Sequence, residues 1–210
     1  MILTVTFNPA IDKTAEVDVM IPGGLNRLKN VMQDAGGKGV NVSKTIHALQ
    51  GKSIATGFLA GSAGEYIQKV LNELVIENDF VWVEGMTRTN LKVLDHDMEL
   101  TELNEAGPVI TETEIKRLKE KILSLIQPDD LVVLSGNVSA GVRNNIYREL
   151  IDIVSSRVPV LFWMRMGSCL RRGYRQSPMQ SSRINMSLRH ILEFHRAAPM
   201  RKSFLWQKHC

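Results

Sequence analysis

The sequence predicts an α/β fold in which helices flank a parallel sheet and a second, smaller β-sheet is added. Strand-like and helix-like segments alternate along residues 1–160, which is typical of a parallel sheet. Residues 131–134 form an uninterrupted apolar run, as expected of a strand covered on both faces. Three more polar strand-like segments interrupt the alternation, and we expect them to form the small sheet: residues 14–19, 28–33 and 89–103.

The strands are predicted where short runs of suitable side chains end at turn residues. Residues 2–7 are rich in β-branched side chains and end at Asn8-Pro9, so they predict the first strand. Apolar and polar side chains alternate along residues 14–19, as in a half-exposed strand. The remaining strands of the parallel sheet are predicted over residues 53–59, 80–83 and 131–134, and from Val158 onward.

Four amphipathic helices are predicted between these strands. The first follows a glycine-rich segment and has Val42, Ile46 and Leu49 on one face. The third begins at a capping box formed by Thr111 and Glu114. The apolar faces of the later helices comprise Ile67, Val70, Leu71 and Leu74, then Ile115, Leu118, Ile122 and Leu125, then Ile146, Tyr147, Leu150, Ile151 and Val154.

The glycine-rich segment Gly36-Gly37-Lys38-Gly39-Val40-Asn41 indicates a ligand site. Glycine permits positive φ and lets a ligand approach the main chain closely. The unpaired N–H groups at a helix start attract anions or ligand oxygens, and Lys38 adds a positive charge. The spacing differs from the Walker A pattern G-x-x-x-x-G-K-[ST]. By itself the segment is equally consistent with an ordinary glycine-rich turn.

The order of several motifs makes the sequence similar to the ribokinase-type (PfkB) carbohydrate kinases. The pattern N-P-x-x-D at Asn8–Asp12 precedes G-G-K-G-x-N at Gly36–Asn41 by about two dozen residues. The stretch Thr4–Pro9 and the pair Asn26-Arg27 resemble the 1-phosphofructokinase and tagatose-6-phosphate kinase branch of that family. The likeness extends from Met1 to about Val160.

This resemblance implies a ribokinase-like fold and an ATP-dependent sugar-phosphate kinase. The implied reaction transfers the γ-phosphoryl group of Mg-ATP to the 6-hydroxyl of fructose 1-phosphate and forms fructose 1,6-bisphosphate. Tagatose-6-phosphate kinase is the nearest alternative, and the motifs do not decide between them. The implied cofactors are ATP and Mg2+, and the implied partner is a sugar phosphate. The small sheet is expected to act as a lid over the sugar. An intact relative is expected to form a homodimer through this lid.

The resemblance assigns four residues near the N-terminus to the sugar. Asp12 would accept hydrogen bonds from sugar hydroxyls, and Gly37 and Asn41 would offer a main-chain N–H and a side-chain amide to the same hydroxyls. Lys38 would contact the substrate or its phosphate. The alternatives are a turn or capping aspartate at position 12, an exposed helix residue at position 41 and a solvated surface lysine at position 38.

Further candidates would hold the phosphate already present on the sugar. Arg27 and Arg88 are two of them, because guanidinium forks suit phosphate oxygens; exposed surface arginines are the alternative. Ser135, Gly136 and Asn137 follow the strand at residues 131–134, at the carboxyl end where α/β folds bind ligands. Ser139 stands where the family usually has a proline, so a less rigid loop is expected there.

Residues 161–210 break this pattern. They contain ten of the 26 Lys and Arg residues but only one acid, Glu193, so residues 1–160 carry a net charge of −5 although the whole chain carries +4. One interpretation is a natural basic tail that binds nucleic acid or an acidic partner. The other is a shift of the reading frame in the coding sequence.

The genetic code supports the frameshift. Trp163-Met164 must be encoded by TGG-ATG, and the frame one base earlier contains GAT, the codon for Asp. In that frame Leu-Asp-x-x-Gly follows Leu161, and the bases for residues 182–187 permit Pro-Asn-x-(His/Tyr)-Glu. The family has a Leu-Asp strand end followed by K-P-N-x-x-E at this place. We therefore predict that residues 1–160 are the N-terminal part of a kinase domain including the lid strands, and that residues 161–210 are an out-of-frame basic tail, with the C-terminal half of the fold missing.

Several further expectations follow from features that the sequence lacks. The family's catalytic aspartate lies in a late G-A-G-D motif, which does not occur in this sequence, so we name no catalytic residue and no metal ligand and expect this chain to be inactive. The two cysteines, Cys169 and Cys210, imply no disulfide framework. No apolar run is long enough to span a membrane and no signal peptide is present, so we expect a cytoplasmic protein. A non-catalytic sugar-phosphate-binding module with a basic tail remains the second hypothesis.

Overall fold

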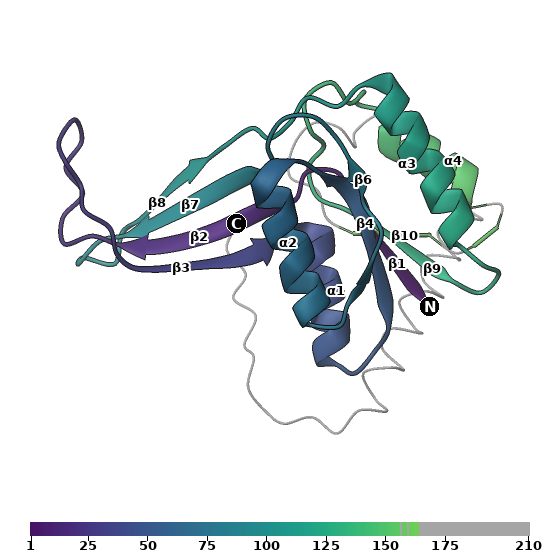
Figure 1. The fold of residues 1–210 in the computed structure, drawn as a ribbon, viewed down its shortest axis with the longest axis horizontal. Coiled ribbons are helices and arrows are strands. Elements are labelled where there is room, and N and C mark those ends of the chain that lie inside the picture. Colours follow the sequence, from purple (N-terminus) through teal and green to yellow (C-terminus); the bar gives the residue numbers. More distant parts are fainter. Residues whose placement is uncertain (156, 159, 164–210) are drawn as a thin grey trace, which may run out of the picture. The chain divides into compact units, whose positions relative to one another are not determined.

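A computed structural model of the chain describes residues 1–155, 157–158 and 160–163, all of which lie within one compact unit, Met1–Arg175. The predicted tail at residues 161–210 therefore lies almost entirely outside the described residues. The predicted fold class is confirmed, because a parallel sheet flanked by helices is present together with a smaller, separate sheet (Figure 1).

The main sheet has β1 at its centre, with the strand order β10-β9-β1-β4-β5 and with β6 also pairing with β4. Every pair in it is parallel, and Thr6 at the end of β1 lies opposite both Gly57 and Ser135. The strands are β1 (Ile2–Thr6), β4 (Ser53–Leu59), β5 (Glu77–Asn78), β6 (Val81–Trp82), β9 (Leu131–Ser135) and β10 (Val160–Trp163).

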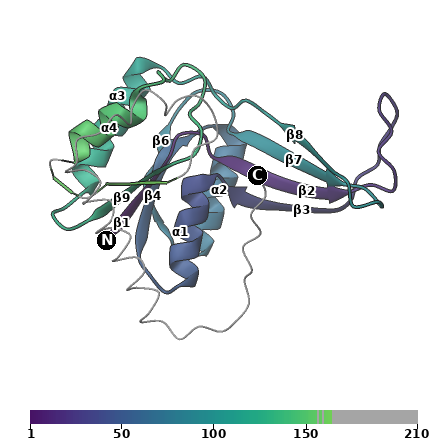
Figure 2. The same cartoon turned by 180° about the vertical axis from the view of Figure 1, so that it is seen from behind.

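Two pairs of helices cover the two faces of the main sheet, with α1 and α2 on one face and α3 and α4 on the other (Figures 1 and 2). Leu3 and Val5 of β1 and Phe7 directly after it belong to the core under α3 and α4. Val40 of α1 and Ile67 of α2 belong to the other core. Burial on both faces is typical of parallel strands, as in β9, where Val132, Val133 and Leu134 are all buried. The helices are α1 (Lys38–Ala48), α2 (Gly61–Glu73), α3 (Glu112–Leu125) and α4 (Ile146–Val154).

The small sheet has the order β3-β2-β7-β8, in which β2 and β7 are parallel and both outer pairs are antiparallel. β2 begins at Ala10, four residues earlier than predicted, and β3 continues to Gly36, three residues beyond its predicted end. Asp12 is therefore a strand residue. The strands are β2 (Ala10–Glu16), β3 (Lys29–Gly36), β7 (Arg88–Leu94) and β8 (Leu100–Asn104).

Two helix features predicted from the sequence, the capping box of α3 and the buried face of α1, differ in how well the structure matches them. The capping box is confirmed, because the Thr111 backbone N–H donates to the Glu114 carboxylate over 2.7 Å and the Glu114 N–H donates to Thr111 Oγ1 over 3.3 Å. The predicted apolar face of α1 is only partly correct, since Val42 and Ile46 are half-buried and Leu49 is 38% exposed. The buried residues of this helix are Gly39, Val40 and Ser43. Small side chains let α1 approach β1 so closely that the Thr4 and Ser43 hydroxyls hydrogen-bond over 2.7 Å.

Candidate functional site

The first part of the site lies where α1 begins above the carboxyl ends of β1 and β9. A Cβ added to Gly39 would lie 2.2 Å from Thr6 Oγ1 and 3.3 Å from Ser135 Oγ. Only glycine fits at position 39 without displacing one of these hydroxyls, because real Cβ contacts below 3.0 Å essentially do not occur. The start of the helix is thereby held directly over two buried hydroxyl groups.

The start of α1 offers backbone donors without a side-chain cap. Gly37 is the N-cap, with φ of 103°, no described side chain accepts a capping hydrogen bond there, and the first turn contains no acid. A Cβ at Gly37 would lie 2.9 Å from Pro9 Cα, so this glycine also permits close contact with the turn between β1 and β2. An uncapped helix start carries partial positive charge and attracts anions.

Lys38 and the loop after β9 border the same helix start. Lys38 is partly buried and makes no ion pair with any described residue, and its side-chain stem packs near Gly136. The loop is held by Tyr147, whose hydroxyl donates to the Gly136 carbonyl over 2.8 Å. Ser139 is buried and donates to the Phe7 carbonyl over 2.9 Å. The loop is therefore tied to the segment directly after β1, and the expectation that it is less rigid than a loop with the family's proline stays a prediction.

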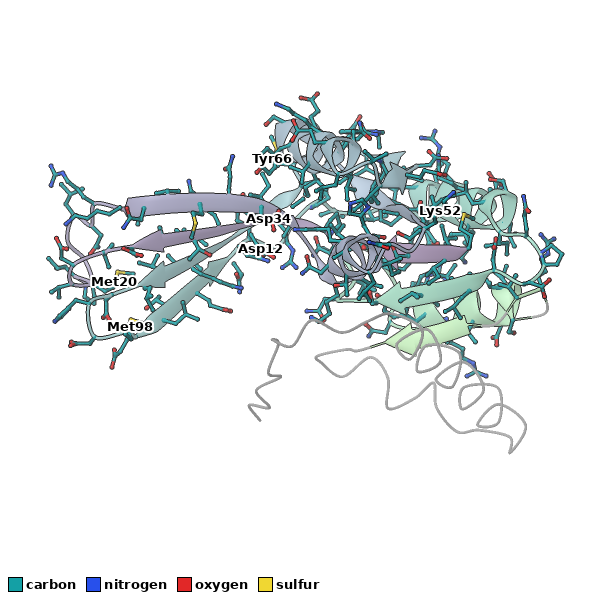
Figure 3. The ribbon with its side chains drawn as sticks, turned by 90° about the horizontal axis from the view of Figure 1, so that it is seen from below. Asp12, Met20, Asp34, Lys52, Tyr66 and Met98 are labelled. Atoms are coloured by element: carbon teal, nitrogen blue, oxygen red, sulfur yellow. The ribbon has the colours of Figure 1, made fainter. Side chains whose placement is uncertain are left out.

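The second part of the site is the end of the small sheet nearest to Gly36. A Cβ at Gly36 would lie 2.1 Å from Asp12 Oδ2, so the Asp12 carboxylate lies directly against that glycine. Asp12 is opposite Asp34 on β3 and opposite Asn90 on β7, and Figure 3 shows the two aspartates on neighbouring strands. Asp34 forms an ion pair with Lys44, which leaves Asp12 as the aspartate of this end that is not bound to a lysine.

Asn90 and Arg88 place further polar groups beside Asp12. Asn90 Nδ2 donates to Asp12 Oδ1 over 3.0 Å, and Arg88 Nη2 donates to the Asn8 carbonyl over 3.4 Å. Burial of the guanidinium lowers the pKa of Arg88 below its ordinary value, and the Asp12 carboxylate opposes this shift. Arg88 is thus partly desolvated, and an anionic ligand would restore interactions that it has lost with water.

Unsatisfied buried polar atoms gather at this site. Among the described residues, five buried side-chain atoms have no hydrogen-bond partner: Thr6 Oγ1, Asn8 Oδ1, Arg88 Nε, Asn90 Oδ1 and Ser135 Oγ. Buried polar groups are almost always paired, and an unpaired one costs about 1–3 kcal/mol. They belong to the end of β1, the turn that follows it, the end of β9 and the first residues of β7. Their clustering indicates a place where water or a polar ligand completes the structure.

The structure brings most of the predicted residues together. Asp12 and Arg88 lie at the near end of the small sheet, and Gly37, Lys38, Ser135 and Gly136 lie around the start of α1. Asn41 is exposed on the first turn of α1, and Asn137 is exposed after β9. The roles of all these residues stay predictions.

Arg27 is not brought to this end of the small sheet. It is exposed in the connection between β2 and β3, beyond the pair Glu16 and Lys29 and not beside the pair Ala10 and Gly36. Six strand residues separate these pairs, which corresponds to roughly 20 Å. In Figure 3, Met20 of the same connection lies at the opposite end of the small sheet from Asp12. Any contact between Arg27 and the ligand of its own chain is therefore unsupported by this geometry.

Sequence reasoning missed Asn90, Thr6 and Asn8. Asn90 is two residues after Arg88 on β7, and alternate strand residues share a face, so this spacing could have identified it. Thr6 and Asn8 lay within the motif used for the resemblance, but no signal distinguished their side chains.

The described residues provide no metal cage and no membrane segment. Among them, no group of three or more His, Cys, Asp or Glu side chains could hold a metal ion. None of their helices has the length and apolar character needed to cross a membrane.

Comparisons with known proteins point to one family. The model of the pfkB family of carbohydrate kinases matches residues 5–173. The chain is 38% identical to Bacillus subtilis 1-phosphofructokinase over 152 residues, which cover 72% of this chain and 49% of that protein. It is 32% identical to Staphylococcus epidermidis tagatose-6-phosphate kinase over 157 residues, which cover 75% of this chain and 50% of that protein. The chain thus spans about half the length of the curated relatives it matches.

Solved structures give the same result. A putative phosphofructokinase from Staphylococcus aureus has a TM-score of 0.71 and 30% identity, covering 88% of this chain and 56% of that one. Escherichia coli phosphofructokinase-2 in complex with fructose-6-phosphate has a TM-score of 0.72 and 26% identity, covering 77% of this chain and 54% of that one.

Proposed function

The chain belongs to the pfkB family of carbohydrate kinases, and we propose that it supplies the sugar-binding part of an ATP-dependent kinase that converts fructose 1-phosphate to fructose 1,6-bisphosphate. The observation that carries this proposal is the group of five unpartnered buried polar atoms around Asp12 and the start of α1. Donors and acceptors are both represented among them, as the hydroxyls and phosphate of a sugar phosphate require. The likeness to 1-phosphofructokinase supports the choice of fructose 1-phosphate.

The proposed site has one end suited to hydroxyls and one suited to phosphate. The Asp12 carboxylate can accept hydrogen bonds from sugar hydroxyls. Such hydrogen bonds are stronger than neutral ones because the acceptor is charged. Arg88, Lys38 and the uncapped N–H groups of α1 supply positive charge for a phosphate. In the proposed role, these groups hold the sugar so that its free hydroxyl is presented to the nucleotide.

ATP and Mg2+ are part of the proposal because of family membership. The described residues do not fit the metal, since they contain no cluster of three or more candidate ligands. No step of the reaction is therefore assigned here to Mg2+ or to the nucleotide. When bound, they would supply the phosphoryl group and neutralise its charge.

Tagatose-6-phosphate kinase is the second candidate activity, and the likeness to the Staphylococcus epidermidis enzyme favours it. Calorimetric titration of the full chain with fructose 1-phosphate and with tagatose 6-phosphate tests both. We expect fructose 1-phosphate to bind more tightly, and the reverse order would favour the tagatose activity. If neither sugar phosphate binds, the proposed function is wrong.

Asp12→Ala and Asp34→Ala form a matched pair for this titration. Asp12→Ala should weaken binding about ten- to a hundredfold, because it removes hydrogen bonds to a charged group. Asp34→Ala should leave binding unchanged, because Asp34 is bound to Lys44 and is 61% exposed. Equal losses would show that the two variants damage the sheet and not a sugar contact.

Turnover by this chain is not expected, because the G-A-G-D motif that carries the family's catalytic base does not occur in its sequence. General bases and oxyanion donors each contribute orders of magnitude in rate. A coupled assay with ATP and fructose 1-phosphate should show no activity. Robust activity that Asp12→Ala abolishes would contradict this.

We retain the proposal that residues 161–210 are translated out of frame. The family match ends at residue 173, beyond the boundary predicted near residue 160, and the boundary itself stays a prediction. Sequencing the locus is the direct test. A frame that continues to G-A-G-D after one base is restored would support the kinase; a stop selected in the present frame would support the non-catalytic binding module with a basic tail.

We also propose that the small sheet joins two copies of the chain. Many large apolar side chains are exposed on the small sheet and its connections, which marks an interaction surface. Arg27 lies away from Asp12 of its own chain, and pairing would give it access to a second copy. Sedimentation should show a dimer that Leu103→Asp dissociates and Val75→Asp, on the main body, does not. The exposed residues are Val19, Ile21, Leu25, Leu28, Val31, Met32, Met98, Leu100 and Leu103.

A further inference from the structure

Asn90 occupies a distinctive position in the small sheet. Its Cα is paired in register with that of Asp12 on β2 and that of Asn104 on β8, and Asp12 is in turn paired with Asp34. Four polar residues therefore form one row across the sheet, which we call the polar row: Asp34, Asp12, Asn90 and Asn104. Because side chains in register share a face, all four project from the same side of the sheet.

The amide of Asn90 is only half satisfied. Its Nδ2 donates to Asp12 Oδ1 over 3.0 Å, but its Oδ1 is buried and has no partner among the described residues. The opposite orientation of the amide would place its oxygen against a carboxylate oxygen, and two acceptors repel each other. The contact with Asp12 therefore fixes which atom is left over, and that atom is an acceptor.

The unpartnered oxygen needs a donor from outside the described chain. The neighbouring cation Arg88 directs its Nη2 to the Asn8 carbonyl, and its buried Nε makes no hydrogen bond to Asn90 or to any other described residue. Asn104 directs its Nδ2 to Glu102 over 3.4 Å. A sugar hydroxyl is a suitable donor, because one hydroxyl can donate to Asn90 Oδ1 while an adjacent hydroxyl donates to the Asp12 carboxylate.

We propose that Asn90 is a sugar-contacting residue that holds the Asp12 carboxylate with its N–H group and accepts a hydrogen bond from a second hydroxyl of the same sugar. This inference rests on the proposed function, since it assumes that Asp12 faces the sugar. It adds a specificity element, because a buried acceptor discriminates against a sugar that lacks the matching hydroxyl. It also divides the polar row into an inner pair that binds sugar, Asp12 and Asn90, and outer residues that do not.

The test is calorimetric titration of the full chain with fructose 1-phosphate. Asn90→Ala should weaken binding about tenfold, as expected from loss of one hydrogen bond to the sugar and of the support for Asp12. The matched control is Asn104→Ala, which removes the same side chain from the same row on the next strand and should leave affinity within about twofold. Asn90→Asp keeps the size of the side chain but places a carboxylate against Asp12, so it should weaken binding more than Asn90→Ala does. This isosteric variant tests the support that Asn90 gives to Asp12, whereas sugar analogues test its contact with a hydroxyl.

Analogues of fructose 1-phosphate that each lack one hydroxyl provide a second measurement. Removing the hydroxyl that donates to Asn90 should weaken binding to the wild-type chain but should not weaken binding to Asn90→Ala any further. If Asn90 has only a structural role, removing any hydroxyl should weaken binding equally in both chains. Independent, additive effects for all analogues would overturn the proposal.

The outcomes separate this inference from the function on which it rests. If the wild-type chain binds no sugar phosphate, both are overturned. If the wild-type chain binds and Asp12→Ala weakens binding, but Asn90→Ala behaves like Asn104→Ala, the proposed function stands and the inference about Asn90 is overturned.

Discussion

The two sheets of this protein are built on different principles. In the main sheet, β1 and β9 are covered by helices on both faces, and Leu3, Val5 and Leu134 are fully buried. In the small sheet, β3 and β8 are largely exposed, and Val93 is the one residue of β7 that is fully buried. The main sheet is specified by apolar burial, whereas the small sheet carries the acids, amides and arginine of the proposed site. The difference indicates that stability and ligand recognition are separable in this fold.

The largest expected effect compares one leucine from each sheet. Leu134→Ala should lower the free energy of unfolding by about 2–5 kcal/mol, because it removes a fully buried side chain and leaves a cavity. Leu103→Ala on β8, where the side chain is 53% exposed in the single chain, should change the free energy of unfolding of the monomer by no more than about 0.5 kcal/mol when it is measured at a protein concentration that dissociates the proposed dimer. Urea unfolding of both variants measures the contrast. Similar losses would mean that the small sheet contributes to the cooperative core.

The next effect concerns binding. Arg88→Ala should weaken fructose 1-phosphate binding by about 1.5–3 kcal/mol, the usual contribution of a hydrogen bond to a charged group, and Arg88→Lys should restore it only partly. The matched control is Lys92→Ala, which removes a cation from the same face of the same strand, at the pair with Thr14, four residue pairs beyond the pair of Arg88 with Ala10. Titration with fructose, which lacks the phosphate, should show little difference between wild type and Arg88→Ala. If Lys92→Ala weakens binding as much as Arg88→Ala does, the loss reflects the net positive charge of the strand and not a contact between Arg88 and the phosphate.

A smaller effect compares a local motif from each region. Thr111→Ala removes the capping box of α3 and should destabilise the protein by about 1 kcal/mol. In the turn between β7 and β8, the Asp95 carboxylate accepts from the N–H groups of Asp97 and Glu99. Asp95→Ala should leave the melting temperature nearly unchanged and increase amide exchange at Glu99, because that turn opens locally. A global loss of stability in Asp95→Ala would contradict the proposed separation.

The smallest effect is a pH dependence that belongs to the main body. The hydrogen bond from Lys119 of α3, with a length of 2.5 Å, is the principal cause that lowers the pKa of Glu149 of α4. A lowered pKa means that the stabilisation is present above the unfolded-state pKa and is lost as the pH falls through the folded-state pKa. Because Glu149 is about one-third exposed, the contribution should stay below about 1 kcal/mol. Wild type and Glu149→Gln should therefore differ in stability near pH 7, and the difference should shrink as the pH falls below the ordinary pKa range of a glutamate carboxyl.

The main sheet could be predicted from the sequence because its signal is local. Apolar runs such as residues 131–134, together with the capping box at Thr111, correspond directly to observed elements. The buried face of α1 was predicted only in part, because periodicity weights large side chains and this helix packs through Gly39 and Ser43. Small residues that permit close approach give no hydrophobic signal.

The candidate site could be predicted only where a family motif marked it. Asp12 and Gly37 were found in this way. The contact between Asn90 and Asp12 was not predicted, because the two residues are 78 positions apart in the sequence. It depends on the register between β2 and β7, which no local pattern indicates. The distance between Arg27 and Asp12 likewise depends on where β2 and β3 begin and end. The predicted start of β2, at residue 14, was four residues too late.

The long separation of these partners has a consequence for the order in which the molecule assembles. The antiparallel pair of β2 and β3 closes within residues 10–36, whereas β7 joins β2 only through contacts that span 78 residues, and Asn8 meets the Ala106 carbonyl across 98. Contacts distant along the chain form late, because closing a longer loop costs more entropy. We therefore expect Asp12 to be placed early and its neighbours Asn90 and Arg88 to arrive last. Pulse-labelling hydrogen exchange during refolding should find β3 amides protected before those of β7. Until β7 pairs with β2, the Asp12 carboxylate should be solvated and should lack its contacts with Asn90 and Arg88.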